Sequence, residues 1–215
     1  MKFYQYNIRD LSDDSYIHYY SLMSEEKKCR VDRFRFEDDK KRTVVGEMLA
    51  RQGITEWCGV PEESIAFEIA EHGKPYAKDL DIEFNISHSA DMVVCVVDDK
   101  PVGVDIEKIR PVDLNTVKRI FNEEETRYIF GRAPDVEDYN HYLNDAVLQR
   151  FFELWTKKEA YGKLIGTGIF AESNAIVLYK TWIEKRYCIS IATSVNKYFF
   201  TARLLFSQLN YDYTV

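Results

Sequence analysis

The sequence predicts an α+β protein of two similar halves related by pseudo-two-fold symmetry, each with an antiparallel sheet packed against a long helix. The order strand, short helices, long helix and strands occurs twice, at an offset of roughly a hundred residues. A chain of 215 residues is long enough for two such domains. No Gly/Ser-rich or Pro-rich linker interrupts it, so the boundary is tight. We expect an N-terminal half at residues 1–101 and a C-terminal half at 102–215.

The first half begins with a strand, because residues 2–8 alternate loosely in polarity. Ser24-Glu25-Glu26 then opens a short charged helix. A long helix is expected from residue 37 to about residue 58, where four apolar side chains share one stripe: Val45, Met48, Leu49 and Trp57. Three strands should follow, at residues 65–69, 82–86 and 92–97. The last is uniformly apolar, which is typical of a strand buried on both faces.

The second half opens after the turn signal Asp98-Asp99-Lys100. Its first strand has two different faces, since Val102, Val104 and Ile106 alternate with a second set: Gly103, Asp105 and Glu107. Helices are expected at residues 114–121, 122–130 and about 148–164, the last ended by Gly166. Residues 174–206 return to β structure.

Charge and cysteine usage exclude several classes of protein. The net charge of −7 argues against a general nucleic-acid-binding surface. The four cysteines are far apart without a C-x-x-C pair, so we expect reduced thiols rather than a zinc knuckle or a disulfide framework. The N-terminus reaches charged residues by Arg9-Asp10, unlike a signal peptide, and the apolar run at 92–97 is far too short to span a membrane. We therefore expect a cytoplasmic protein with no membrane partner.

Asp105 and Glu107 should project from the same side of their strand. Two neighbouring carboxylates repel each other, and the simplest interpretation is a solvated strand edge. Asp105 would then be an exposed residue whose removal leaves the fold intact. Gly103 on the same face leaves room for a close approach to the backbone. A hard cation would relieve the repulsion and suits oxygen ligands.

A second group of polar residues lies on the last long helix, where Trp155, Glu159 and Lys163 share one face. A helical salt bridge beside a core tryptophan would also explain this spacing. Upstream, Phe84-Asn85-Ile86-Ser87-His88-Ser89 brings small polar groups and a histidine to the expected end of a strand, where ligand contacts are common. A Ser-His hydrolase is disfavoured, because the chain has no G-x-S-x-G elbow.

Two further features allow both a structural and a functional interpretation. Asn122-x-x-Glu125 has the form of a capping box, so helix initiation alone would explain Glu125. Residues 27–42 hold eight basic and four acidic side chains. Such a segment is usually a solvated helix face, but it would also suit the phosphate groups of an anionic ligand.

Three motifs together resemble the Sfp-type phosphopantetheinyl transferases over roughly residues 24–170. They are Phe84-Asn85-Ile86-Ser87-His88-Ser89, Gly103-Val104-Asp105-Ile106-Glu107 and Trp155-x-x-Lys158-Glu159-Ala160-x-x-Lys163. The resemblance implies transfer of the phosphopantetheine arm of coenzyme A to a serine of an apo acyl or peptidyl carrier protein. Adenosine 3',5'-bisphosphate would be released, and Mg2+ is the implied cofactor.

The resemblance also implies roles for particular residues. Mg2+ would be held by Asp105, Glu107 and Glu159. Lys163 would contact the phosphates and aid the leaving group, while Glu159 or Glu125 would help to deprotonate the serine. The implied coenzyme A contacts are Lys27, Arg30, Arg42, Lys74, Ser87, His88 and Lys163. The chain departs from the family in a longer segment at 131–150, which bears on carrier docking, and in Arg30, where lysine is often seen.

Two other functions were weighed against transfer. A nucleotide pyrophosphate hydrolase would use the same metal site with water as the nucleophile. A non-catalytic adaptor would bind a partner through an aromatic-rich surface that draws on 15 Tyr and 13 Phe. Three motifs in register favour the transferase. The sequence leaves the carrier open among fatty-acid, polyketide and nonribosomal-peptide synthases, and a monomer is expected because two halves in one chain could form a complete site.

Overall fold

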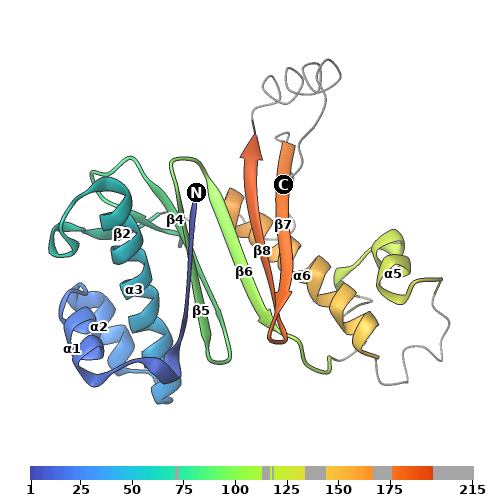
Figure 1. Ribbon diagram of the computed structural model, residues 1–215, viewed down its shortest axis with the longest axis horizontal. Coiled ribbons are helices and arrows are strands. Elements are labelled where there is room, and N and C mark those ends of the chain that lie inside the picture. The colour runs from blue at the N-terminus through green and yellow to red at the C-terminus, as the bar shows by residue number, and fades with distance from the viewer. Residues whose placement is uncertain (71–72, 113–116, 118, 134–143, 167–175, 196–215) are drawn as a thin grey trace.

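The computed structural model describes residues 1–70, 73–112, 117, 119–133, 144–166 and 176–195 (Figure 1). The N-terminal half contains β1 (Lys2–Asn7), η1 (Ile8–Asp10), α1 (Asp13–Ser21), α2 (Glu25–Asp32), α3 (Glu37–Cys58), η2 (Glu62–Ser64), β2 (Phe67–Ile69), β3 (Pro75–Ala77), β4 (Glu83–Ser89) and β5 (Met92–Asp98). The C-terminal half contains β6 (Val102–Lys108), α5 (Glu123–Phe130), α6 (Asp145–Ile165), β7 (Ile176–Glu184) and β8 (Tyr187–Val195). The predicted mixture of helices and antiparallel sheets is confirmed, whereas the pseudo-two-fold relation stays a prediction.

Each half pairs a three-stranded antiparallel sheet with one long helix. In the N-terminal half the strand order is β1-β5-β4, and α3 packs on this sheet with α1 and α2 on its outer side (Figure 1). In the C-terminal half the order is β6-β8-β7, and α6 packs against β6 and β8. Strands β2 and β3 form a separate two-stranded ribbon. The two larger sheets meet where β6 lies against β4 and β5.

Strand β5 is buried on both faces, as its apolar run predicts. Val93, Cys95 and Val97 belong to the core beneath α3. Val94 and Val96 point the other way and pack with apolar side chains of β6 and β8, namely Val102, Val104, Ile106, Ile189 and Ile191. This second cluster joins the two halves through buried apolar surface, so the junction between them is a packed core.

The two long helices end where the sequence predicts. Helix α3 stops at Gly59 and α6 at Gly166, and both glycines adopt a left-handed conformation, with φ of 72° and 73°. Helix α6 begins at Asp145, three residues earlier than expected, because the Asn144 side chain caps it by accepting a hydrogen bond from the backbone N–H of Val147. Lys163 lies in the last turn of α6, where a cation is favoured.

Some elements differ from the prediction. Strand β4 continues to Ser89 instead of ending at residue 86, because its pairing with β5 persists up to the turn at Ala90-Asp91. The Ser87-His88-Ser89 segment is therefore inside a strand. Helix α1 and strand β3 were not anticipated. Of the helix expected at 114–121, only residues 117, 119, 120 and 121 are described, while residues 134–143 of the 131–150 segment and 196–206 of the last β region lie outside the described residues.

The structure bears on membrane-spanning helices and on the state of the cysteines. Among the helices that the structure describes, none combines the length and the apolar character needed to cross a membrane. The four cysteines are unpaired: Cys29, Cys58, Cys95 and Cys188. The reduced thiols that the cysteine spacing predicts are therefore confirmed.

Candidate active site

Side chains from three elements meet at the junction of the two halves. Asp105 of β6 accepts a hydrogen bond at its Oδ1 from Lys163 Nζ of α6, at 2.7 Å. The Ser87 hydroxyl of β4 donates to the same Oδ1 at 2.8 Å, and Lys163 Nζ also donates to Ser87 Oγ at 2.8 Å. Three residues far apart in the sequence thus form a closed triangle of hydrogen bonds. Each half of the chain contributes to it.

Gly103 determines how closely α6 approaches β6. A Cβ at this position would lie 2.0 Å from the carbonyl oxygen of Ala160 and 2.5 Å from the backbone nitrogen of Leu164. The close approach expected at Gly103 is therefore confirmed, and the group that approaches is the backbone of α6. Glu159 and Lys163 adjoin those two helical residues, so the close packing at Gly103 also brings Glu159 and Lys163 close to β6.

Asp105 is buried, with 5% of its surface exposed. The expectation of an exposed strand carboxylate is wrong, because α6 and β4 cover that side of β6. Its Oδ2 is also buried and has no hydrogen-bond partner. A buried carboxylate oxygen without a partner is costly, and a bound cation is one way to satisfy it.

Three carboxylates at the junction influence one another. Burial raises the pKa of Glu159 above its ordinary value, and the charges of Asp105 and Glu107 add to this effect while Lys163 opposes it. Burial also raises the pKa of Glu107; the hydrogen bond from Ser89 opposes the shift, and the charge of Asp105 reinforces it. The negative charge of Asp105 therefore disfavours ionisation of both Glu107 and Glu159.

The residues present fit a hard divalent cation by chemistry. Asp105, Glu107 and Glu159 supply oxygen donors only, and Asp105 Oδ2 has no partner. Within the described ranges, no three His, Cys, Asp or Glu side chains are gathered closely enough to hold a metal as they stand. Asp105 pairs with Lys163 instead.

Glu125 forms the predicted capping box. The backbone N–H of Asn122 donates to Glu125 Oε2, the N–H of Glu125 donates to Asn122 Oδ1, and both distances are 2.9 Å. The other carboxylate oxygen pairs with Lys158 Nζ of α6 at 2.7 Å. Glu125 therefore starts α5 and also ties it to the helix residue next to Glu159. Its proton-transfer role stays a prediction.

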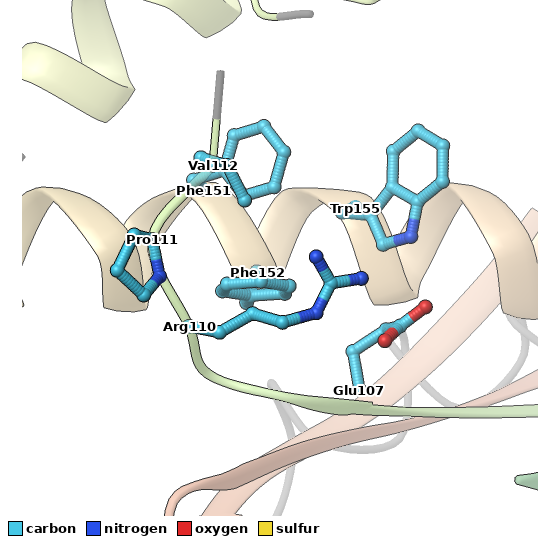
Figure 2. Close-up of a pocket in the computed structure, with 7 residues that line it drawn as sticks. All are labelled: Glu107, Arg110, Pro111, Val112, Phe151, Phe152 and Trp155. Atoms are coloured by element: carbon cyan, nitrogen blue, oxygen red, sulfur yellow. The ribbon is translucent and has the colours of Figure 1, made fainter. Parts of the chain in front are cut away.

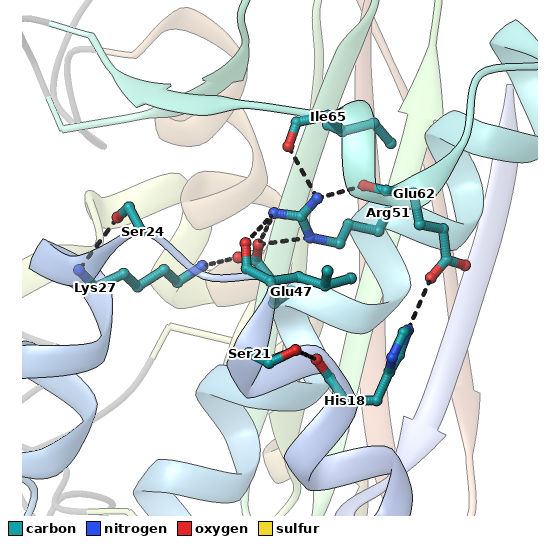
Figure 3. A network of polar contacts seen from close by, with 9 residues as sticks. His18, Ser21, Ser24, Lys27, Glu47, Arg51, Glu62 and Ile65 are labelled. Atoms are coloured by element: carbon teal, nitrogen blue, oxygen red, sulfur yellow. Dashed lines mark hydrogen bonds and ion pairs between the residues drawn. The ribbon is translucent and has the colours of Figure 1, made fainter.

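Lys27 takes part in a network inside the N-terminal half (Figure 3). Its Nζ lies 2.6 Å from Glu47 Oε2, and Glu47 also pairs with Arg51, one helical turn along α3. Glu47 and Arg51 are both buried. The guanidinium additionally donates to the backbone carbonyl of Leu22. Lys27 therefore joins α2 to α3 and already has a carboxylate partner.

Arg42, His88 and Lys163 lie in one region that also holds carboxylates. One guanidinium nitrogen of Arg42 donates to the carbonyl oxygen of Ala90 at 2.7 Å, in the turn after β4, and another pairs with Asp39 at 2.5 Å. Desolvation lowers the pKa of His88, the charges of Arg42 and Lys163 lower it further, and the charge of Asp39 opposes the shift. A phosphate group bound here would compete with Asp39 for Arg42.

The other predicted coenzyme contacts are basic residues of the N-terminal half. Arg30 is exposed on α2, one helical turn after Lys27. Lys74 pairs with Glu83 at 2.8 Å, at the end of β4 opposite His88. The structure therefore brings Ser87 and Lys163 into contact and places Arg42 and Lys163 close enough to His88 to affect its pKa. Whether Lys27, Arg30 and Lys74 contact the coenzyme stays a prediction.

A cavity of about 300 Å³ opens beside Glu107 (Figure 2). Besides Glu107, its lining contains one cation, Arg110, and five residues with apolar or aromatic side chains: Pro111, Val112, Phe151, Phe152 and Trp155. Figure 2 shows the guanidinium of Arg110 and the indole nitrogen of Trp155 both directed toward the Glu107 carboxylate. Arg110 was not predicted as a site residue, because a lone arginine after a strand carries no motif. Ser89 was not predicted as an individual site residue either, although its spacing of two with Ser87 was a usable signal.

Comparisons with known proteins agree with this geometry. The family model for the N-terminal region of 4'-phosphopantetheinyl transferase matches residues 10–100, and that of the 4'-phosphopantetheinyl transferase superfamily matches residues 101–205. The 4'-phosphopantetheinyl transferase psf-1 of Bacillus pumilus is 40% identical over 149 residues, which cover 69% of this chain and 60% of the relative. For gsp of Aneurinibacillus migulanus the identity is 35%, covering 82% and 68%. For Sfp of Bacillus subtilis strain 168 it is 36%, covering 79% and 72%.

The two α+β halves thus meet at an acidic junction that contains one lysine. With matches to both family models, the chain belongs to the 4'-phosphopantetheinyl transferase family and is of that enzyme type. The aligned regions span 60 to 72% of the length of the three relatives named above.

Proposed function

We propose that the protein transfers the 4'-phosphopantetheine arm of coenzyme A to a serine hydroxyl of an apo acyl or peptidyl carrier protein. The reaction depends on Mg2+ and releases adenosine 3',5'-bisphosphate. The observation that carries the proposal is the Lys163–Asp105–Ser87 triangle beside two carboxylates of raised pKa, in a chain of this family. Charge neutralisation and alignment of the reacting groups are the main requirements of such a transfer.

The transfer forms one bond and breaks another. The serine oxygen attacks the phosphorus that carries the pantetheine arm, and the bond from this phosphorus to the oxygen bridging the pyrophosphate breaks. Glu159 or Glu125 takes the hydroxyl proton, since a raised pKa suits Glu159 to this task and Glu125 lies beside it through Lys158. Lys163 supplies positive charge where the leaving phosphate gains negative charge.

The metal and the coenzyme use different residues. Asp105, Glu107 and Glu159 would hold Mg2+, which would neutralise charge on the pyrophosphate oxygens. Arg42 and His88 would contact the phosphates of coenzyme A next to Lys163. Lys27, Arg30 and Lys74 would also contact coenzyme A. Lys27 would then share its charge with Glu47 and Lys74 with Glu83, the carboxylates with which they already pair.

Incubation with coenzyme A, Mg2+ and apo carrier proteins, followed by intact-mass measurement, tests the proposal. The carrier should gain the mass of one phosphopantetheine arm, and a carrier whose serine is replaced by alanine should not. Asp105→Asn is a matched inactive control, because it keeps the shape of the side chain and removes its charge. Turnover of coenzyme A without any carrier would instead indicate a pyrophosphate hydrolase. No mass gain with fatty-acid, polyketide and peptide carriers would contradict the proposal.

We also infer a pseudo-two-fold relation between the halves, with the boundary in the turn between β5 and β6. The helices of 22 and 21 residues, each on a three-stranded antiparallel sheet, support it. Because one chain supplies all the residues of the site, we propose that it acts as a monomer. We further propose a cytoplasmic enzyme without nucleic-acid or membrane partners, on the basis of its four unpaired cysteines and its net charge of −7.

A further inference from the structure

Strand β4 presents a row of polar side chains to the edge of β6. Asn85, Ser87 and Ser89 alternate with Phe84, Ile86 and His88, so the three share one face of the strand. Each accepts a hydrogen bond from a backbone N–H of β6: Val104 N to Asn85 Oδ1 at 2.9 Å, Ile106 N to Ser87 Oγ at 3.3 Å and Lys108 N to Ser89 Oγ at 3.1 Å. We name this row the polar seam.

The seam replaces an ordinary ladder between two strands. Strands β4 and β6 are each at the edge of their own sheet, and the backbone N–H groups of β6 that face β4 need partners. Side-chain oxygens at every second position of β4 satisfy them. The two sheets therefore dock in one register, because a shift by one residue would turn Phe84, Ile86 and His88 toward β6.

The two serines of the seam also hold the carboxylates. Ser87 Oγ donates to Asp105 Oδ1 and Ser89 Oγ donates to Glu107 Oε2, both at 2.8 Å. A hydroxyl has one proton and two lone pairs. Because a backbone N–H already occupies one lone pair of each serine, the proton is directed to the carboxylate. Asn85 differs from the two serines. The residue that precedes its backbone donor Val104 is Gly103, which has no side chain, whereas Asp105 and Glu107 precede the donors of Ser87 and Ser89.

Ser87 and Ser89 differ in how fully their hydroxyls are used. Ser87 Oγ accepts from Ile106 N and Lys163 Nζ and donates to Asp105, which uses its whole capacity. Ser89 Oγ accepts from Lys108 N and donates to Glu107. Ser89 therefore isolates the link between the seam and a single carboxylate, without a direct contact to Lys163.

We propose that Ser89 is a positioning residue that orients the Glu107 carboxylate as a metal ligand, as Ser87 orients Asp105. The inference rests on the proposed function and deepens it, since it names the device by which the coenzyme-binding half holds the carboxylates of the other half. Outer partners that hydrogen-bond to a ligating carboxylate typically change metal affinity or activity by about 10- to 100-fold when removed. A serine that only joined the sheets would have no such effect on the metal.

The test compares substitutions along the seam. Ser89→Ala removes the link to Glu107, Ser89→Thr keeps the hydroxyl, and Ser89→Cys keeps the shape with weaker hydrogen bonds should the alanine variant fold poorly. Asn85→Ala is the matched control, because it removes a seam bond that touches no carboxylate. Mn2+ binding is followed by electron paramagnetic resonance with coenzyme A present and no carrier, so that no turnover is needed. Urea unfolding, kcat and the KM for coenzyme A complete the set.

We expect Ser89→Ala to weaken Mn2+ binding about 10- to 100-fold and to lower kcat with little change in KM. Ser89→Thr should restore Mn2+ binding, Ser89→Cys should fall in between, and Asn85→Ala should lose stability with Mn2+ binding unchanged. Equal loss of stability in Ser89→Ala and Asn85→Ala, with Mn2+ binding unchanged in both, would overturn the inference. Mn2+ binding by the wild type without transfer to any carrier would overturn the proposed function only. No Mn2+ binding by the wild type would overturn both.

Discussion

Replacing Gly103 with alanine should separate α6 from the strand that carries Asp105 and Glu107. The added Cβ would lie 2.0 Å from Ala160 O and 2.5 Å from Leu164 N, whereas ordinary contacts begin at 3.4 Å. Both neighbours are backbone atoms of one helix, so no change of side-chain rotamer relieves the overlap. The helix must withdraw from β6 by roughly 1.5 Å, a form of overpacking.

This displacement should affect stability and rate together. Lys163 moves with the helix, so its hydrogen bonds of 2.7 Å to Asp105 and 2.8 Å to Ser87 would lengthen past the limit of a useful bond. Overpacking costs about 1–3 kcal/mol of unfolding free energy. A misplacement of about 1 Å at a reacting group lowers the rate about 100-fold. We expect kcat/KM to fall by that factor and stability to fall at the upper end of the range.

Urea unfolding followed by circular dichroism and carrier modification followed by intact mass measure the two effects. Gly46→Ala in α3 is the matched control, because a Cβ there meets a side-chain atom of Ile86 at 3.3 Å, an overlap of only about 0.1 Å that a small side-chain shift relieves. Alanine also favours a helix by about 1 kcal/mol relative to glycine. The control should keep its activity and most of its stability. Wild-type stability and turnover in Gly103→Ala would refute the account of how α6 is seated.

Three further substitutions test the charges at the site. In Glu159→Gln, transfer should be lost and the melting temperature without metal should rise at pH 8, because the folded state disfavours the charged form of a carboxyl with a raised pKa. The stability of the wild type falls as pH rises through that pKa. The difference in melting temperature between variant and wild type should therefore shrink at pH 5. Glu125→Gln keeps the cap and loses the surface pair with Lys158, so the free energy of unfolding should change by under about 1 kcal/mol. If kcat falls tenfold or more, proton transfer is assigned to Glu125; if kcat is unchanged, it is assigned to Glu159. Lys163→Ala should lower kcat far more than it raises the KM for coenzyme A, and an effect confined to KM would contradict its role at the leaving phosphate.

Local patterns in the sequence were sufficient for most of the elements. The apolar stripe of residues 37–58 and the run at 92–97 predicted α3 and β5, because helical periodicity and uniform burial are properties of neighbouring residues. The capping box at Asn122 and Glu125 was predicted for the same reason. The end of β4 was misplaced, since polar Ser87 and Ser89 suggest a loop unless a second sheet is known to need their hydroxyls.

The sequence by itself determined the mixed α+β class, the motifs and the set of charged residues, because these depend on residue type and spacing. Only the tertiary structure decided what those residues do to one another. Asp105 is buried because α6 and β4 cover its strand, Gly103 admits the backbone of α6, and Lys27 is paired with Glu47. The physical reason is that burial, ion pairing and pKa depend on groups distant in the chain, which meet only when each half folds and the two halves dock.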